Sequence, residues 1–206
     1  EVWKIKHKHT NKFYACKIFT DEIPKEKILI EAECIRKMGE LNVSPKLIKV
    51  QDHCIVMEMV NGIVLKEYIK RNPIYNEDII QNLLEIAYAL IESNINYNDL
   101  NVNYNIMFDN DKEKLLLIDY GLLLTNEEKE KKYKPHNLTD EEITTICAFN
   151  IIFEVEEKYM VKMFGTNYIH TPIIKGFIPP ERLSKFPSIL KYIDEELGLN
   201  IDEKRW

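Results

Sequence analysis

The hydrophobic pattern of this chain changes its period once, near residues 59–62, and that change limits the possible folds more than any other feature. Before it, apolar residues mostly alternate in short runs; after it, they recur mainly at helical spacing. A period of two indicates strands, and a spacing of three to four residues indicates helices. The sequence therefore predicts an α+β fold of two lobes, a small antiparallel β lobe with one helix at residues 1–60 and a mostly helical lobe at residues 61–206.

The first lobe is predicted to contain two strand pairs separated by a helix. Residues 1–20 alternate between apolar and polar side chains around a polar turn, which is typical of a hairpin. Pro24 suits the first turn of a helix and Gly39 suits its end. Residues 47–59 then contain a second pair of short apolar runs, which we also interpret as strands.

The second lobe is predicted to contain helices and one short hairpin. The hairpin covers residues 106–118, and the highly charged residues 125–137 indicate a loop. Apolar residues at helical spacing predict helices at residues 64–69, 79–93, 139–163 and 185–197.

Composition excludes several classes of function. Of the 206 residues 45% are hydrophobic and 30% charged, which is typical of a globular domain. The net charge of −6 provides no general attraction for nucleic acid or anionic membranes, and no apolar run is long enough to span a bilayer. The four cysteines form no C-x-x-C pair, which argues against zinc and favours a reducing, intracellular and cytoplasmic location. Because the chain opens inside a strand without Met, we expect it to begin partway through a longer polypeptide.

One lysine and three acidic residues are candidates for a catalytic site. Lys17 lies at the end of the apolar strand 14–18, and Glu31 on the next helix can pair with it. Asp99 lies in a loop after a long helix, and Asp119 follows four apolar residues. A lysine that neutralises phosphate, together with carboxylates that hold a hard cation or orient a hydroxyl, meets the needs of a Mg²⁺–nucleotide site.

In their order and spacing, residues 1–121 resemble the eukaryotic-type protein kinase family. Ala15-Cys16-Lys17 is similar to the V-A-I-K element, Tyr97-Asn98-Asp99-Leu100 to H-R-D-L, and Asp119-Tyr120-Gly121 to D-F-G. The resemblance implies a two-lobed protein-kinase-like fold with ATP and Mg²⁺ as cofactors. It also implies transfer of the γ-phosphate to a serine or threonine hydroxyl of a protein partner.

The resemblance implies catalytic roles for Lys17, Glu31 and Asp99. Lys17 would bind the α- and β-phosphates, and Asp99 would accept the proton of the attacking hydroxyl. Apolar residues four and seven positions after Glu31 favour it over Glu33 as the partner of Lys17.

The implied metal ligands are Asp119 and an asparagine of the catalytic loop. That asparagine normally stands five residues after the catalytic acid, where this chain has Tyr104. Asn105 follows one residue later and directly precedes the apolar strand that matches the family, so we prefer Asn105 with a one-residue insertion, and Asn103 is the second candidate.

The resemblance also implies a set of residues for the nucleotide. Val2 would close a Gly-rich loop, Met57 would be the gatekeeper, and backbone groups of Glu58 and Val60 would bond the adenine. Together with Lys17, the implied nucleotide-binding set comprises Val2, Ala15, Met57, Glu58, Val60 and Met107.

Departures from the family pattern leave other functions open. The Gly-rich loop itself is missing, and Asn98 replaces the arginine beside the catalytic acid, so activation by loop phosphorylation is not expected. The second lobe is short, as in compact atypical kinases of the Bud32 type. The alternatives are a pseudokinase that binds partners without phosphotransfer, a Bud32-like ATPase, and a small-molecule phosphotransferase.

Two features of the second lobe allow more than one interpretation. Asp140 is either the buried acid of the family's F helix or an acid in the first turn of a helix that Thr139 caps. Pro179-Pro180-Glu181 superficially resembles the family's A-P-E element, although it lies some sixty residues beyond Asp119.

Overall fold

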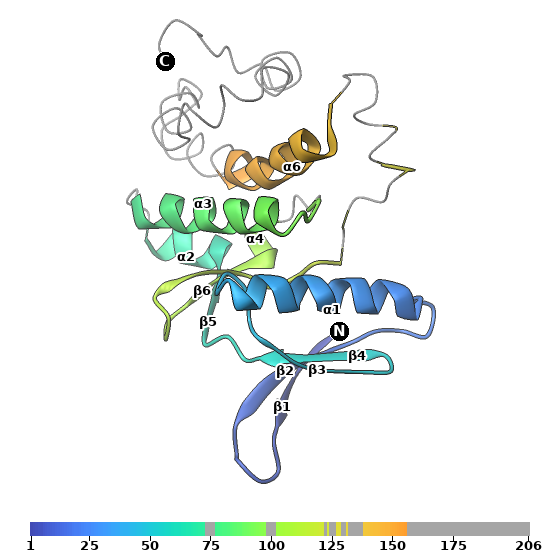
Figure 1. Ribbon diagram of the computed structural model, residues 1–206. Coiled ribbons are helices and arrows are strands. Elements are labelled where there is room, and N and C mark those ends of the chain that lie inside the picture. The colour runs from blue at the N-terminus through green and yellow to red at the C-terminus, as the bar shows by residue number, and fades with distance from the viewer. Residues whose placement is uncertain are drawn as a thin grey trace, which may run out of the picture. The chain divides into compact units, whose positions relative to one another are not determined.

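The computed structural model describes residues 1–72, 77–97, 102–121, 123, 127–128, 131 and 138–155 (Figure 1). The chain divides into two compact units. Unit 1 contains Glu1–Tyr75 and Asn101–Leu122, and unit 2 contains Asn76–Leu100 and Leu123–Trp206. The predicted lobe border at residue 60 stays a prediction.

The first sheet of unit 1 is antiparallel, with the strand order β1-β2-β4-β3. Val2 lies opposite Lys17, and Ala15 lies opposite Met57. Because opposed residues and residues two apart point to the same side of a sheet, these four side chains share one face. The strands are β1 (Val2–Lys6), β2 (Phe13–Ile18), β3 (Leu47–Gln51) and β4 (Cys54–Glu58).

Helix α1 (Lys25–Glu40) packs against β3 and β4 of this sheet. It begins directly after Pro24 and ends one residue beyond Gly39, close to the predicted bounds. Its buried residues recur at intervals of three and four, as on one face of a helix. They comprise Ile28, Glu31, Ala32, Cys34, Ile35, Met38 and Gly39, so a carboxylate lies within an otherwise apolar stripe.

A second sheet in unit 1 has the order β5-β6-β7 and consists of β5 (Gly62–Val64), β6 (Ile106–Asp109) and β7 (Lys114–Leu117). The sequence predicts the β6–β7 hairpin but not β5, because three residues are too few to show alternation. Gly62 is required here, since a Cβ atom at this position would lie 1.8 Å from the Phe108 carbonyl oxygen.

Two short helices accompany the second sheet. Helix α2 (Leu65–Arg71) follows β5 directly, at the place of the predicted helix 64–69. Helix α4 (Val102–Asn105) precedes β6 and was not predicted. The amide of Leu117 on β7 donates to the Val43 carbonyl at 2.9 Å, which ties the hairpin to the loop after α1.

Unit 2 contains α3 (Glu77–Glu92) packed against α6 (Asp140–Val155). Both helices occur where helical spacing predicts them. At the start of α6, the Thr139 hydroxyl accepts from the Glu142 amide at 3.3 Å, and the Thr139 amide donates to Glu142 Oε2 at 2.7 Å. This reciprocal pair is a capping box. Asp140 is exposed, so of its two interpretations the first-turn acid agrees with the structure.

Several predicted features lie outside the described residues. They are Asp99, the helix at 185–197, the end of the helix at 139–163, most of the charged loop 125–137, and Pro179-Pro180-Glu181. Within the described part of the chain, no helix combines the length and apolarity needed to cross a membrane.

Candidate active site

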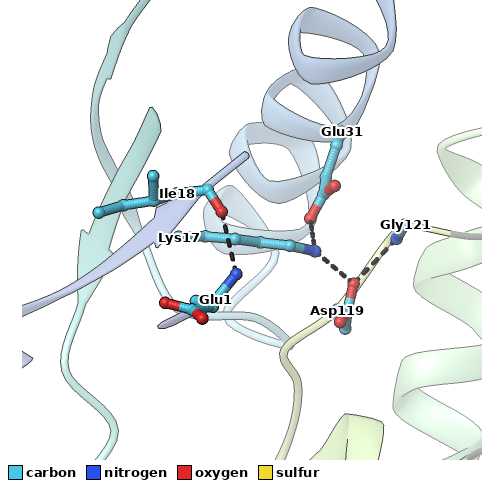
Figure 2. Close-up of polar contacts among 6 residues, drawn as sticks. All are labelled: Glu1, Lys17, Ile18, Glu31, Asp119 and Gly121. Atoms are coloured by element: carbon cyan, nitrogen blue, oxygen red, sulfur yellow. Dashed lines mark hydrogen bonds and ion pairs between the residues drawn. The ribbon is translucent and has the colours of Figure 1, made fainter. Parts of the chain in front are cut away.

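Lys17, Glu31 and Asp119 meet in unit 1 (Figure 2). The Lys17 ammonium donates to Glu31 Oε1 at 2.6 Å and to Asp119 Oδ1 at 2.7 Å. The side chains of Lys17 and Glu31 are 15% and 5% exposed, whereas that of Asp119 is 39% exposed. The cluster is therefore closed on the side of α1 and open to water at Asp119.

Sequence position explains how each member reaches this cluster. Lys17 belongs to the face of the first sheet that also carries Val2 and Ala15. Glu31 projects from the buried stripe of α1, and Asp119 follows β7 by two residues. The predicted preference for Glu31 agrees with the geometry, because Glu33 pairs instead with Arg36 on the exposed side of the helix.

The cluster holds one cation and two carboxylates, and this excess of negative charge favours the protonated forms of Lys17 and Glu31. Burial alone would lower the pKa of Lys17, but the charges and hydrogen bonds of Glu31 and Asp119 outweigh it, so that pKa is raised. Burial also raises the pKa of Glu31, against the opposing effect of Lys17, and the charge of Asp119 adds to the rise. A bound cation would relieve the same imbalance.

The residues after Asp119 close the cluster. The Tyr120 amide forms a hydrogen bond to Glu31 that opposes the rise in its pKa. The Gly121 amide donates to Asp119 Oδ1 at 2.9 Å. A Cβ atom at Gly121 would lie 3.2 Å from Asp119 Oδ1 and 3.6 Å from Lys17 Nζ, so the glycine leaves room for the ion pair.

Asn105 lies beside the same segment. Its carbonyl oxygen accepts from the Ile118 amide at 2.8 Å, next to Asp119, and the residue is 7% exposed. Tyr104, at the family's usual asparagine position, is 49% exposed and receives a hydrogen bond from Lys66 at 2.5 Å. The geometry thus favours Asn105 over Tyr104 as the neighbour of Asp119.

Carboxylate and amide oxygens, such as those of Asp119 and Asn105, are the kind of ligand that a hard cation takes. Among the described residues, the hydrogen bonds to Asp119 come from Lys17 and Gly121, and both end on Oδ1 and not on Oδ2. Mg²⁺ typically takes one or two protein oxygens and completes its shell with water and phosphate. Among the described residues, no group of three or more His, Cys, Asp and Glu gathers as a metal cluster, but a site of this kind does not require one.

The implied adenine-binding residues also belong to unit 1. Val2, Ala15 and Met57 share the sheet face of Lys17, and Met107 lies on β6, opposite Leu116. Met57 is buried and Val2 is exposed. Glu58 ends β4, and the nearby Val60 is buried.

The tip of the β6–β7 hairpin holds the segment at residues 58–62. The motifs did not predict this contact. Lys112 donates to Glu58 Oε2 at 2.9 Å, and the Asn110 amide donates to the Asn61 carbonyl at 2.9 Å. Partial burial alone would raise the pKa of Glu58, but the bonds from Lys112 and the Lys46 amide outweigh it and lower the pKa. No local sequence signal identifies these contacts, because the partners are about fifty residues apart.

Two of the predicted site residues remain without a structural description. Asp99 and the side chain of Asn103 lie outside the described part of the chain. The structure therefore brings together Lys17, Glu31 and Asp119, with Asn105 beside them.

Fold and site together define a member of the protein kinase superfamily. A family model described as "RIO domain" matches residues 3–134, more than half of the chain. The chain therefore belongs to the RIO domain family, which agrees with the predicted kinase resemblance and with the expectation of an atypical member.

Two further proteins are similar to this chain. The chain is 29% identical over 138 residues to a probable serine/threonine-protein kinase, fnkB, of Dictyostelium discoideum; the match covers 59% of this chain and 25% of that protein. The chain thus spans about a quarter of that relative's length. A crystal structure of the Rad53 kinase domain and SCD2 matches with a TM-score of 0.53 at 20% identity, over 92% of this chain and 79% of the other. This likeness shows the kinase fold.

Proposed function

We propose that this chain is a protein kinase that uses ATP and Mg²⁺ to phosphorylate a serine or threonine hydroxyl of a protein. The observation that carries the proposal is the contact of the Lys17 ammonium with both Glu31 and Asp119, in a chain of the RIO domain family. A lysine placed beside a cation-binding carboxylate meets the main requirement of phosphoryl transfer, which is positioning and charge neutralisation.

Each member of the cluster has a separate task in this proposal. Lys17 donates hydrogen bonds to the α- and β-phosphates, and Glu31 holds the Lys17 side chain in an extended position. Asp119 and Asn105 supply oxygen ligands for Mg²⁺, which when bound neutralises charge on the phosphate oxygens. Asp99 accepts the proton of the attacking hydroxyl and orients its oxygen.

The sheet face that carries Lys17 supplies the binding surface for the base. Val2 and Ala15 pack on one side of the adenine ring and Met107 packs on the other, with Met57 at the inner end. Backbone groups of Glu58 and Val60 form hydrogen bonds with the ring edge. The ion pair of Glu58 with Lys112 supports this assignment, because it holds the segment that presents those groups.

The test is an Asp119→Asn variant assayed for phosphate transfer from labelled ATP to a generic protein substrate and to itself. Asn keeps the shape of the side chain but removes the charge that would hold the cation, so we expect transfer to fall by about 10³-fold or more. Asp52→Asn is the matched control, since it removes the same charge at an exposed turn with a φ of 42°, a conformation that Asn tolerates. Undiminished transfer by Asp119→Asn would refute the proposed site.

The second candidate is nucleotide hydrolysis without a protein acceptor, as in a Bud32-like ATPase. The observation that favours it is the additional residue between Asp99 and Asn105, which changes the spacing of the catalytic loop. Measurement of free phosphate and of phosphoprotein in the same reaction separates the two functions. Phosphate release without phosphoprotein supports the ATPase, and nucleotide binding without either product supports the pseudokinase.

A further inference from the structure

A buried threonine of α6 is bonded to the turn that follows α3. The Thr144 hydroxyl lies 2.6 Å from Asn96 Oδ1, 3.2 Å from Asn94 Oδ1 and 2.9 Å from the Asp140 carbonyl oxygen. Thr144 is 1% exposed. Three oxygens from two different segments therefore meet at one hydroxyl, and all of these residues belong to unit 2.

The chemistry of the hydroxyl explains why a polar residue is needed at this position. A hydroxyl has one proton to donate and two lone pairs to accept with, and an asparagine amide turned by 180° offers its NH₂ group in place of its oxygen. The amides and the Asp140 carbonyl can thus all be satisfied by a threonine or serine. An apolar side chain of the same shape would remove the bonds from α6 to the exposed Asn94 and the half-buried Asn96 side chains.

The turn that Thr144 holds has a defined backbone. Asn94 adopts a φ of 53°, its amide donates to the Ile91 carbonyl at 3.1 Å, and the Ile95 amide donates to the Leu90 carbonyl at 2.9 Å. These bonds form a Schellman motif with Asn94 in the left-handed position that ends α3. Asn94 thus ends the helix with its backbone and reaches α6 with its side chain.

We propose that Thr144 is a positioning residue for phosphoryl transfer. Through Asn94 and Asn96 it holds the segment that leads directly into Asp99, which follows Asn96 by three residues in the sequence. This inference rests on the proposed function, in which Asp99 is the catalytic base. It assigns to α6 the task of setting where the catalytic loop begins.

The neighbouring threonine provides a matched comparison. Thr145 is 6% exposed, and its hydroxyl donates to the Glu141 carbonyl at 2.8 Å, four residues back, as that of Thr144 does to Asp140. Among the described residues, only the Thr144 hydroxyl of these two bonds to the turn at residues 94–96. Thr144→Val and Thr145→Val therefore remove the same group from the same helix, and only the first breaks the link.

The first measurement is amide hydrogen exchange of the whole chain, followed at residues 90–97. Thr144→Val should increase the exchange rate of the Ile95 amide by about tenfold, because the loss of a buried hydrogen bond permits local opening. Thr145→Val and Thr144→Ser should match the wild type. Asn94→Gly keeps the left-handed backbone but removes the side-chain amide that reaches Thr144, so the exchange rate of the Ile95 amide should also rise in that variant.

The second measurement separates turnover from nucleotide affinity. Thr144→Val should lower kcat by about tenfold or more and leave the KM for ATP within about twofold, since misplacement of a catalytic group affects the chemical step and not the binding of the base. Thr144→Ser should restore kcat. Thermal unfolding of each variant confirms that it is folded at the assay temperature.

The outcomes of these two measurements are distinguishable. Equal exchange rates of the Ile95 amide in Thr144→Val and Thr145→Val overturn the inference. If the wild-type chain transfers phosphate, an unchanged kcat in Thr144→Val also overturns it. A wild-type chain that transfers no phosphate refutes the proposed function instead. In that case the exchange data alone decide whether Thr144 holds the segment.

Discussion

At the scale of single residues, the Glu31 carboxylate is buried in the apolar stripe of α1, which costs the fold free energy of desolvation. A buried charge is tolerated when a partner and further hydrogen bonds satisfy it. Glu31 has both, from the Lys17 ammonium and the Tyr120 amide. Removal of one partner is expected to destabilise the fold by more than the intact pair stabilises it. The cluster is therefore better evidence for a functional site than for a contribution to stability.

The raised pKa of Glu31 leads to a prediction about stability and pH. Because the folded chain binds this proton more tightly than the unfolded chain, the stabilisation from Glu31 is fully present below its ordinary pKa of 4.5 and is lost as the pH rises through the folded pKa. The difference in unfolding free energy between wild type and Glu31→Gln should therefore fall as the pH rises from about 4 towards neutrality. Urea unfolding at several pH values measures it.

Glu33→Gln is the control for this experiment, because Glu33 lies two residues further along α1 and has the opposite shift. Hydrogen bonding and charge from Arg36 lower the pKa of Glu33. Its stabilisation is present above its ordinary pKa and is lost as the pH falls through the folded pKa. The difference in unfolding free energy between wild type and Glu33→Gln should thus rise with pH. If both differences change with pH in the same direction, the assignment of the Glu31 pKa shift to burial is contradicted.

At the scale of elements, the close approach of β5 to β6 depends on one glycine. A Cβ atom at Gly62 would lie 1.8 Å from the Phe108 carbonyl oxygen and 2.8 Å from its carbon, both of them backbone atoms. Backbone atoms of a paired strand cannot yield without breaking the pairing. Gly62 is therefore required for the second sheet of unit 1.

Gly62→Ala should lower the free energy of unfolding by about 3 kcal/mol, at the upper end of the usual cost of overpacking. Denaturant unfolding measures the change. Gly39→Ala is the comparison: its Cβ would lie 3.0 Å from the Pro45 carbonyl oxygen, a smaller intrusion, and alanine favours the helix. If both variants lose the same stability, the close approach at Gly62 is not the cause.

Most elements could be predicted from the sequence because their patterns are local. The strand pairs, α1, α3 and the β6–β7 hairpin occur near their predicted bounds. Strand β5 and helix α4 were missed, since three and four residues are too short to show a period. Strand β5 depends on its pairing with β6, and helix α4 packs against α2 and β5, and these are tertiary contacts.

At the scale of the whole molecule, the proposed site predicts that nucleotide binding stabilises the fold in a way that depends on Mg²⁺. A ligand that binds only the native state raises the melting temperature, by a few degrees for a chain of this size at saturating concentration. ATP with Mg²⁺ should raise the Tm of the wild type by more than ATP alone. Thermal unfolding with each combination measures the two increments.

Variants assign these increments to residues. Asp119→Asn should lose the increment that Mg²⁺ adds and keep the increment of ATP alone, because Asp119 is proposed to hold the cation and not the base. Asp52→Asn should behave as the wild type. A Mg²⁺-dependent increment that survives in Asp119→Asn would show that the cation binds elsewhere.

The sequence by itself determined the kinase resemblance and the residue types of the site, because both lie in short motifs whose order survives without any knowledge of contacts. Only the tertiary structure decided which of these residues meet. Lys17 and Asp119 are 102 positions apart, and Thr144 reaches Asn96 across 48. Such pairs form because packing closes the intervening chain into a loop and brings buried polar groups to the partners that satisfy them, and no local pattern encodes that choice.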